Sequence, residues 1–272
     1  MKFLILFLIL PMLFLTSKED RTRYFPIVVE HPEELPSKEN LWVFILAGQS
    51  NMAGRGLVEP RDTIPNPRVL TINQDGEIII AKSPLHFYEP SRTGLDLGHR
   101  FGNVMAEHLP DSVSVLIVPT AVGGTSISFW IEDHDFRGVR LLTNFRKMID
   151  RAGSVGTVKA VLWHQGESDS NEEGIPLYKG RMTELFSKFR EFAGEDELPI
   201  IVGELGLHDK NAVNRGRINQ IIHDYAESDP WSAVVPTTDL SHVGDSTHFN
   251  SEALRTMGER FAGEYLRYFF SR

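Results

Sequence analysis

The stretch that decides the fold is "LWVFILAGQSNMAGRG", Leu41–Gly56. Its first part, Leu41–Ala47, is an unbroken apolar run, which is typical of a strand buried on both faces of a parallel sheet. The run ends abruptly in Gly48–Asn51, where small and polar residues follow and Ser50 stands between two amides. The pattern predicts an α/β fold in which a buried strand delivers a serine to a turn at its carboxyl end.

Four more short apolar runs indicate further strands of the same sheet: Val113–Pro119, Val158–Trp163, Pro199–Val202 and Ala233–Val235. Apolar residues at helical spacing mark three segments between or after these runs, at residues 95–109, 177–192 and 250–270. Strands that alternate with helices predict a central parallel sheet of about five strands with helices on both faces. We expect a single domain over residues 41–272.

The segment Arg55–Arg92 fits this alternation poorly. It contains an expected hairpin around Asp75-Gly76, between "RVLTIN" and "EIIIA". We interpret the segment as an insertion over one end of the sheet that forms a rim of a substrate cleft.

The first 40 residues are typical of a targeting segment followed by a linker. Residues 1–17, "MKFLILFLILPMLFLTS", have one lysine and then an apolar stretch, which is the layout of a secretory signal peptide. The stretch is shorter than the roughly 20 residues of a spanning helix and Pro11 interrupts it, so an uncleaved anchor is less favoured. Residues 18–40 predict a linker with at most a short strand at Ile27–Val29. We expect an exported protein, periplasmic or extracellular, with no stable membrane insertion after signal removal.

Composition narrows the partners. The 272-residue chain carries a formal net charge of -9, so its surface would repel a phosphate backbone and we expect no nucleic-acid partner. The chain has no cysteine, which excludes disulfides and thiolate metal sites. Its length is enough to bury a core that folds without them.

Polar side chains and glycines follow every predicted strand. Because ligands of open α/β sheets bind beyond the carboxyl ends of the parallel strands, these residues are expected to meet at one edge. In strand order they are Gln49–Asn51, Gly123 with Gly124, His164–Asp169, Glu204, and Asp245 with His248.

These residues suffice for acyl transfer. A serine hydroxyl becomes a good nucleophile when a base takes its proton, and histidine is the usual base. Asp245 and His248 are three residues apart, so one turn of chain can present both groups to Ser50. The available oxyanion donors are the N–H groups of Ser50 and Gly124 and the side-chain amide of Gln165.

Each of these residues alone also has a structural explanation. A serine on a glycine-flanked turn is often a helix cap, a Gly-Gly pair is often a tight turn, and loop carboxylates are often only solvated. Residues suited to the same reaction follow all five predicted strands, and this coincidence favours the functional interpretation.

The motifs do not match the G-x-S-x-G nucleophile elbow, because Met52 stands where the second glycine belongs. They resemble the SGNH hydrolases, and within them the carbohydrate-esterase branch that includes acetylxylan esterases of carbohydrate esterase family six and sialate O-acetylesterases. The matching pieces run in family order from Asn40 onward. They are "GQSNM" at Ser50, "GGTS" at Gly123–Ser126, "HQGESD" at His164–Asp169, and the Asp-x-x-His pair Asp245/His248.

The resemblance implies a flavodoxin-like three-layer α/β/α sandwich, no metal or other cofactor, and removal of acetyl groups from sugar hydroxyls. It marks Ser50 as the nucleophile and His248 as the base, and it gives Gln165 the oxyanion position that the wider family fills with asparagine. The acid that orients His248 stays open between Asp245, which we favour slightly, and Glu167.

The expected substrate is an acetylated polysaccharide or oligosaccharide, with acetylxylan first and a sialate O-acetyl ester as the alternative. Sialic acid carries a carboxylate that needs an arginine near Ser50, and the candidates are Arg55, Arg61 and Arg92. The aromatic residues Trp130 and Phe249 either stack on a sugar ring or belong to the core. The expected substrate-binding residues are Gln49, Asn51, Gly123 and Glu204.

Two other functions fit parts of the sequence. His164 with Glu167, and Asp245 with His248, repeat one spacing and offer ligands for a metal-dependent hydrolase, but that function leaves Ser50 without a role. A non-catalytic sugar-binding module is the other alternative, and it would have no need of the Ser50/His248 pair.

Overall fold

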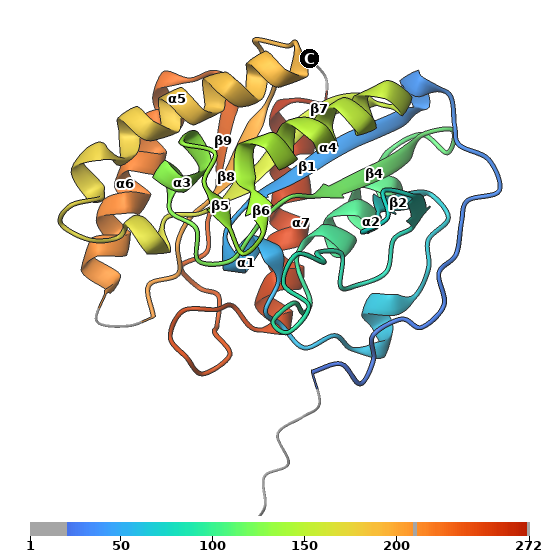
Figure 1. Cartoon of the computed structure of the whole chain (residues 1–272), viewed down its shortest axis with the longest axis horizontal. Coiled ribbons are helices and arrows are strands. Elements are labelled where there is room, and N and C mark those ends of the chain that lie inside the picture. The colour runs from blue at the N-terminus through green and yellow to red at the C-terminus, as the bar shows by residue number, and fades with distance from the viewer. Residues whose placement is uncertain (1–20, 209–210, 271–272) are drawn as a thin grey trace, which may run out of the picture.

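The computed structural model of the chain describes residues 21–208 and 211–270. A central sheet lies between two layers of helices (Figure 1), as expected for an α/β/α sandwich. The predicted signal peptide, residues 1–17, lies outside the described residues.

The main sheet of the described residues has seven strands in the order β3-β2-β4-β1-β7-β8-β9. All neighbouring strands are parallel except β2 and β3. The strands are β1 (Leu41–Gly48), β2 (Val69–Ile72), β3 (Ile78–Ile80), β4 (Ser114–Pro119), β7 (Thr157–His164), β8 (Ile200–Gly203) and β9 (Ser232–Val235). A small separate hairpin is formed by β5 (Asp135–Phe136) and β6 (Val139–Arg140).

The five predicted strands are all present, and the sheet gains two more from the Arg55–Arg92 segment. Its hairpin forms β2 and β3, and β2 extends the sheet by pairing with β4. The segment is therefore partly a sheet edge as well as an insertion. Apolar β2 side chains such as Val69 and Ile72 are buried, which explains why the hairpin joins the core.

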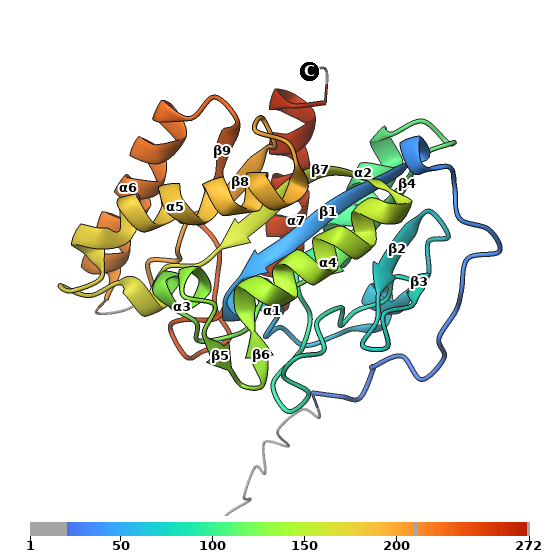
Figure 2. The ribbon, with the colours of Figure 1, turned by 45° about the horizontal axis from the view of Figure 1, so that its top comes forward.

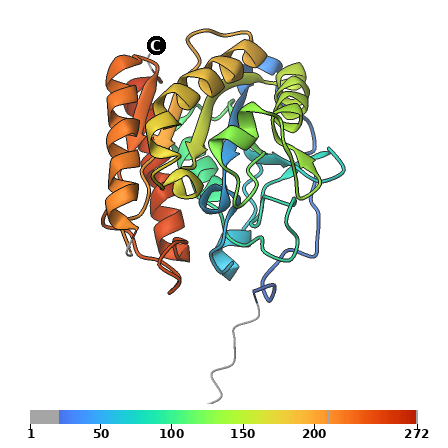
Figure 3. The same cartoon turned by 60° about the vertical axis from the view of Figure 1, so that its left-hand side comes forward.

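Helices cover both faces of the sheet (Figures 2 and 3). The α-helices are α1 (Ser50–Ala53), α2 (Gly98–His108), α3 (Ile127–Ile131), α4 (Leu141–Val155), α5 (Ile175–Ala193), α6 (Ala212–Ser228) and α7 (Ser251–Tyr268). The 3-10 helices are η1 (Lys38–Asn40), η2 (Pro60–Thr63) and η3 (Glu167–Asp169). Side chains of α3, α4, α5 and α6 share one core with one face of the sheet, and those of α1, α2 and α7 share another with the opposite face.

The central strand β1 shows why its sequence is continuously apolar. Val43 and Ile45 pack into the core on one face, while Phe44 and Leu46 pack into the core on the other. Alternate side chains of a strand point to opposite faces, so a strand covered on both faces has no polar position.

Of residues 18–40, the structure describes residues 21–40, which form no helix or strand before the 3-10 helix η1 at Lys38–Asn40. No strand forms at Ile27–Val29, and these three side chains are exposed. The chain lies beside β3 instead, where the Ile80 N–H donates a 2.8 Å hydrogen bond to the Glu30 carbonyl oxygen. Within the described residues, no helix combines the length and the apolar character needed to cross a bilayer.

Candidate active site

The carboxyl ends of β1 and β7 hold the turn that carries Ser50 in place. Gly48, the last residue of β1, pairs with His164, the last residue of β7. A Cβ on Gly48 would lie 2.1 Å from the His164 carbonyl oxygen, and its φ of +135° is unfavourable for other residues. The Gln49 N–H donates to that same carbonyl at 3.0 Å. The close approach lets the chain turn at once into α1, whose first residue is Ser50.

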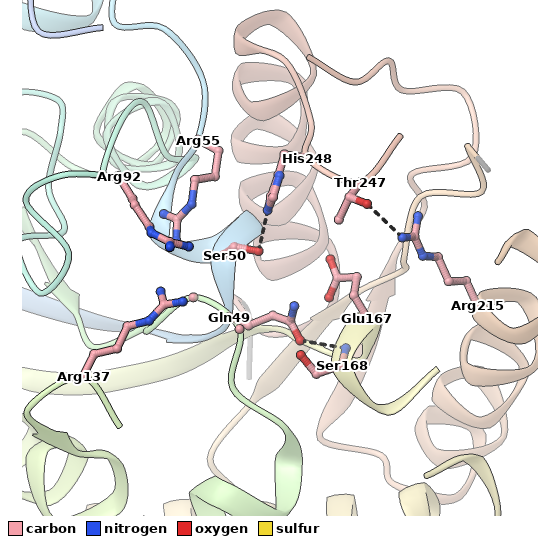
Figure 4. A pocket seen from close by; sticks show the side chains of 12 residues that line it. Gln49, Ser50, Arg55, Arg92, Arg137, Glu167, Ser168, Arg215, Thr247 and His248 are labelled. Carbon is pink, nitrogen blue, oxygen red and sulfur yellow. Dashed lines mark hydrogen bonds between the residues drawn. The ribbon is translucent and has the colours of Figure 1, made fainter. Parts of the chain in front are cut away.

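Ser50, His248 and Asp245 form a continuous chain of hydrogen bonds. Figure 4 shows the bond between Ser50 and His248. The His248 Nε2 lies 2.9 Å from the Ser50 Oγ, and the His248 Nδ1 lies 2.6 Å from the Asp245 Oδ2. Serine and histidine are 198 positions apart in the chain. The fold therefore brings together the three groups in the geometry of a catalytic triad.

Asp245 is held as a carboxylate. Partial burial raises its pKa, but hydrogen bonds from the backbone and side chain of His248 and from the Thr247 N–H lower the pKa further, to about 2. An ionised acceptor at Nδ1 keeps the imidazole proton on that nitrogen. The Nε2 lone pair is then available to accept the proton of the Ser50 hydroxyl.

Glu167, the other candidate for orienting the histidine, has a different contact. Its Oε1 accepts a 2.5 Å hydrogen bond from the Asn51 Nδ2. Asn51 also donates to the Thr247 carbonyl oxygen at 3.1 Å and accepts from the Phe249 N–H at 3.0 Å. Glu167 thus holds Asn51, whose side chain bonds the backbone on both sides of His248. Asp245 is the carboxylate that contacts the imidazole.

Two of the three predicted oxyanion donors lie at the pocket. Ser50 and Gly124 both line it, and within the described residues no hydrogen bond uses either N–H. Gly124 has φ of +83°, in the region that favours glycine.

Gln165 is not at the pocket. Its side chain is fully buried, and Nε2 donates to Asp169 Oδ2 at 2.6 Å and to the Thr125 carbonyl and Gln49 Oε1 at 3.1 Å each. An amide with three acceptors beneath the pocket floor is not aimed at a bound ester, so the structure does not support the oxyanion role expected for Gln165.

Gln49, and not Gln165, has its side-chain amide at the pocket. Its Oε1 accepts from Gln165 and from the Ser168 N–H, at 3.1 and 3.3 Å. That pairing fixes the amide orientation, and its nitrogen is directed toward Ser50 and the pocket (Figure 4). The sequence signal for Gln49 was its position directly before Ser50. Sequence alone does not show which of the two amides, Gln49 or Gln165, points into the pocket.

The remaining predicted substrate contacts separate into two groups. Gln49 and Gly123 line the pocket. Asn51 is buried behind it, and Glu204 instead accepts from His223 Nε2 at 2.7 Å and from the Thr237 N–H at 3.1 Å. The aromatic candidates are core residues, because Trp130 and Phe249 are both fully buried.

Four arginines line this cavity of about 340 Å³, which the sequence did not predict as a set: Arg55, Arg92, Arg137 and Arg215. Figure 4 shows the first three gathered on one side of Ser50 and the fourth on the other. Burial first, and then the positive charges of Arg137, Arg92 and Arg21, lower the pKa of Arg55 to about 10. Arg61, the third arginine considered from sequence, pairs with Glu59 and Glu252 away from this pocket.

Buried Glu89 ties the arginines to the glycine turn. Its carboxylate pairs with Arg137 and, at 2.7 Å, with Arg55, and it accepts a 2.6 Å hydrogen bond from the Gly123 N–H. One carboxylate therefore positions both guanidinium groups and the turn that carries Gly124.

The overall similarity of the chain to known proteins agrees with this geometry. Residues 40–267 match the model of the family described as carbohydrate esterase, sialic acid-specific acetylesterase. The chain belongs to this carbohydrate esterase family. A probable carbohydrate esterase from Arabidopsis thaliana is 30% identical over 247 residues, which cover 84% of this esterase and 91% of the relative.

Solved structures share the fold. The X-ray structure of that Arabidopsis thaliana protein matches with a TM-score of 0.73 at 28% identity, over 86% of this esterase and 100% of that chain. NanS matches with a TM-score of 0.66 at 18% identity, over 88% and 100% of the two chains. A carbohydrate acetylesterase from Xanthomonas citri matches with a TM-score of 0.62 at 16% identity, over 86% of this esterase and 57% of that chain. The predicted resemblance to the carbohydrate-esterase branch of the SGNH hydrolases is confirmed.

Arg215 also holds the catalytic loop of this esterase. From α6, its Nη1 donates to the Ser246 carbonyl at 3.0 Å and its Nη2 donates to the Thr247 Oγ1 at 3.2 Å. These bonds fix the two residues between Asp245 and His248. Arg215 is thus both a wall of the pocket and a support of the triad.

The residues considered for a metal-dependent hydrolase do not form a ligand set. His164 is fully buried, and its Nε2 lies 2.9 Å from the Glu204 carbonyl oxygen. Over residues 21–208 and 211–270, no three His, Asp or Glu side chains are grouped so that they could hold a metal ion.

Proposed function

We propose that this esterase removes O-acetyl groups from carbohydrate through an acetyl-enzyme intermediate on Ser50. The observation that carries the proposal is the hydrogen-bonded chain from Asp245 through His248 to Ser50. It supplies an activated nucleophile, a base and an orienting carboxylate in one pocket.

In the first step the Ser50 Oγ attacks the acetyl carbonyl carbon while the His248 Nε2 takes the hydroxyl proton. The carbonyl oxygen becomes an oxyanion, for which Ser50 N–H, Gly124 N–H and the Gln49 amide are the donors we assign. When the bond to the sugar oxygen breaks, His248 returns the proton to that oxygen and the deacetylated sugar leaves.

In the second step water hydrolyses the acetyl-enzyme. His248 takes a proton from the water, whose oxygen attacks the same carbonyl carbon through a second oxyanion. The bond to the Ser50 Oγ then breaks, His248 returns its proton to that oxygen, and acetate leaves. No redox step or outside reactant other than water is needed.

The arginines of the pocket favour an acetylated sugar that carries a carboxylate. Arg55 and Arg137 already share Glu89, whereas no carboxylate of the described residues pairs with Arg92. The neutral backbone of acetylxylan would bring no anionic partner to these arginines. A sialate O-acetyl ester would place a carboxylate among them. The family description, sialic acid-specific acetylesterase, supports the same choice, so we place the acidic sugar first and acetylxylan second.

Acetate release tests the proposal. We would measure it side by side on O-acetyl sialic acid, acetylated xylan and acetylated mannan, with the Ser50→Ala variant as the blank. Faster release from the acidic sugar supports the substrate order, and faster release from xylan reverses it. Release that is equal in the wild type and the Ser50→Ala variant on every substrate contradicts the esterase itself.

We also propose that the protein is exported, on the strength of the charged start and apolar run in residues 1–17. Expression from its own N-terminus and mass measurement of the mature chain test this proposal. Loss of roughly the first 17 residues supports export, and an intact N-terminus in the cytoplasmic fraction contradicts it.

A further inference from the structure

A second cavity, of about 630 Å³, lies next to the catalytic pocket. It is lined by the turn between β2 and β3, by Phe87 and Tyr88, by the β5–β6 hairpin and by one side of α4. Figure 2 shows α4 with this hairpin at its start and the β2–β3 pair beside it. Arg137 lines both cavities, so the two are neighbours that share one guanidinium group.

The charge of this second cavity is strongly positive. Its lining includes Arg137, Arg140, Lys147 and Arg151, against a single acidic residue, Asp75. Arg137 pairs with Glu89 and Arg140 with Asp133.

Two of these cations have no ion pair of their own. In the described part of the chain, no carboxylate lies within salt-bridge distance of Lys147 or Arg151. Both side chains are exposed on α4, one helical turn apart. They therefore present a pair of charges to solvent on the cavity wall of a protein whose net charge is -9.

Two aromatic side chains, Phe87 and Tyr88, also line this cavity. The Phe87 and Tyr88 rings lie 4.4 Å apart and are tilted by 43°. Tyr88 is fixed, since its hydroxyl donates to the Pro119 carbonyl and accepts from the Asn144 Nδ2, both at 3.0 Å. Phe87 is half-buried, so part of its ring remains for stacking on the apolar face of a sugar.

We propose that the second cavity binds further sugars of an acidic oligosaccharide whose acetylated unit occupies the Ser50 pocket. This proposal rests on the proposed esterase function and extends its substrate from a single sugar to a chain. The sharing of Arg137 gives a path from one cavity to the other, the cations match sugar carboxylates, and Phe87 offers a ring face. A sugar chain is favoured as the occupant because the second cavity adjoins the pocket in which the proposed acetylated sugar binds.

Binding of unacetylated oligosaccharides to the wild-type protein tests the cavity without turnover. We would titrate the protein with hexagalacturonate, which carries a carboxylate on each sugar, and with neutral xylohexaose, by calorimetry. We expect hexagalacturonate to bind at least about tenfold more tightly, and its affinity to fall as salt is raised. Equal affinities for the two hexamers would overturn the proposal.

A double variant and a matched control test whether hexagalacturonate binds at the α4 wall of the second cavity. Lys147→Ala/Arg151→Ala is expected to weaken hexagalacturonate binding by about tenfold. The matched control is Arg146→Ala, on the same exposed helix, whose side chain lies over Phe192 and not in the cavity. The control is expected to keep wild-type affinity and aryl acetate turnover.

The outcomes separate the two proposals. If the double variant binds hexagalacturonate as tightly as the control does, the second cavity is not the subsite, whatever the esterase activity. If aryl acetate turnover survives Ser50→Ala, the esterase function fails, whatever the titrations show.

Discussion

Asp245 uses both of its carboxylate oxygens on one short loop. Oδ1 accepts from the N–H groups of Thr247 and His248, each at 2.9 Å, while Oδ2 faces the imidazole. The same residue therefore shapes the loop and contacts the imidazole of the proposed base, His248. Ser246, with φ of +59°, lets the loop fold back tightly enough for both contacts.

Replacing this carboxylate by an amide should disable the base. In Asp245→Asn the Nδ1 proton loses its anionic acceptor, so we expect kcat on an aryl acetate to fall by about 10³–10⁴-fold. Glu167→Gln is the comparison, because it retains shape and the contact to Asn51 and should cost less activity. Steady-state kinetics of both variants decides the matter, and a larger loss in Glu167→Gln would give the orienting role to Glu167.

The lowered pKa of Asp245 predicts the acid side of the pH profile. Its pKa of about 2 lies below the unfolded value of about 3.9, so its ionised form and the contacts it makes persist above pH 4 and are lost as pH falls through about 2. Protonation of Asp245 should therefore add nothing to the loss of activity between pH 8 and pH 4, and log kcat/KM should fall there with a slope no steeper than one. A slope of two in the profile of log kcat/KM between pH 8 and pH 4 would be inconsistent with the lowered pKa of Asp245.

Gln49 offers a sharp test of the oxyanion assignment. Gln49→Leu removes the donor that is directed toward Ser50, and we expect kcat to fall about 10²–10³-fold with a smaller change in KM. Circular dichroism and a thermal melt serve as controls for folding. An unchanged kcat in a folded variant would remove Gln49 from the oxyanion site.

At the scale of elements, the strands were easier to predict than the helices. Strands β1, β4, β7, β8 and β9 are covered on both faces, so each is a continuous apolar run in the sequence. Helix α6 was not predicted because its buried stripe is interrupted by Arg215 and Asn219. Both polar residues bond the backbone of neighbouring loops, which a periodic pattern does not reveal.

The helix η2 is fastened to α7 by a buried ion pair. Arg255 donates two hydrogen bonds to Asp62, at 2.8 Å from Nε and 2.7 Å from Nη2, and both side chains are less than a tenth exposed. The pair joins the Arg55–Arg92 segment to the helix that follows the catalytic loop.

Breaking this ion pair should lower the stability of the folded protein. Asp62→Ala removes two charged hydrogen bonds from Arg255 and leaves it only the more exposed carboxylates of Glu59 and Glu252, each at 3.3 Å. We therefore expect the free energy of unfolding to drop by about 1.5–3 kcal/mol. Urea denaturation measures the change. Asp111→Ala, which removes the exposed partner of Arg68, should leave the midpoint of urea denaturation unchanged. Equal effects of the two substitutions would show that the buried pair is not a structural tie.

At the scale of the whole molecule, the sheet explains what sequence could and could not predict. The rule that ligands lie beyond parallel strand ends brought Ser50, Gly124 and His248 to one edge, where the structure has them. The rule does not say which side chain of each segment turns inward. Gln165 lies beneath the floor, and the arginines come from four separate segments that no motif connects.

Charge is likewise uneven across the molecule. The chain is acidic overall, and yet its two adjacent cavities carry arginine and lysine side chains. The net charge alone predicted only that nucleic acid is not a partner, because it averages over the whole surface. The folded arrangement favours an acidic sugar, since local charge, and not the net charge, is what a bound substrate meets.

Covalent labelling tests whether Ser50 is the nucleophile of this esterase. The protein would be treated with a serine-directed phosphonate, digested, and searched by mass spectrometry for the modified residue, while loss of aryl acetate turnover is followed in parallel. We predict one phosphonylated residue, Ser50, with labelling and inactivation at the same rate and neither in the His248→Ala variant. Full inactivation with Ser50 unmodified, or labelling of Ser50 with turnover intact, would contradict the account.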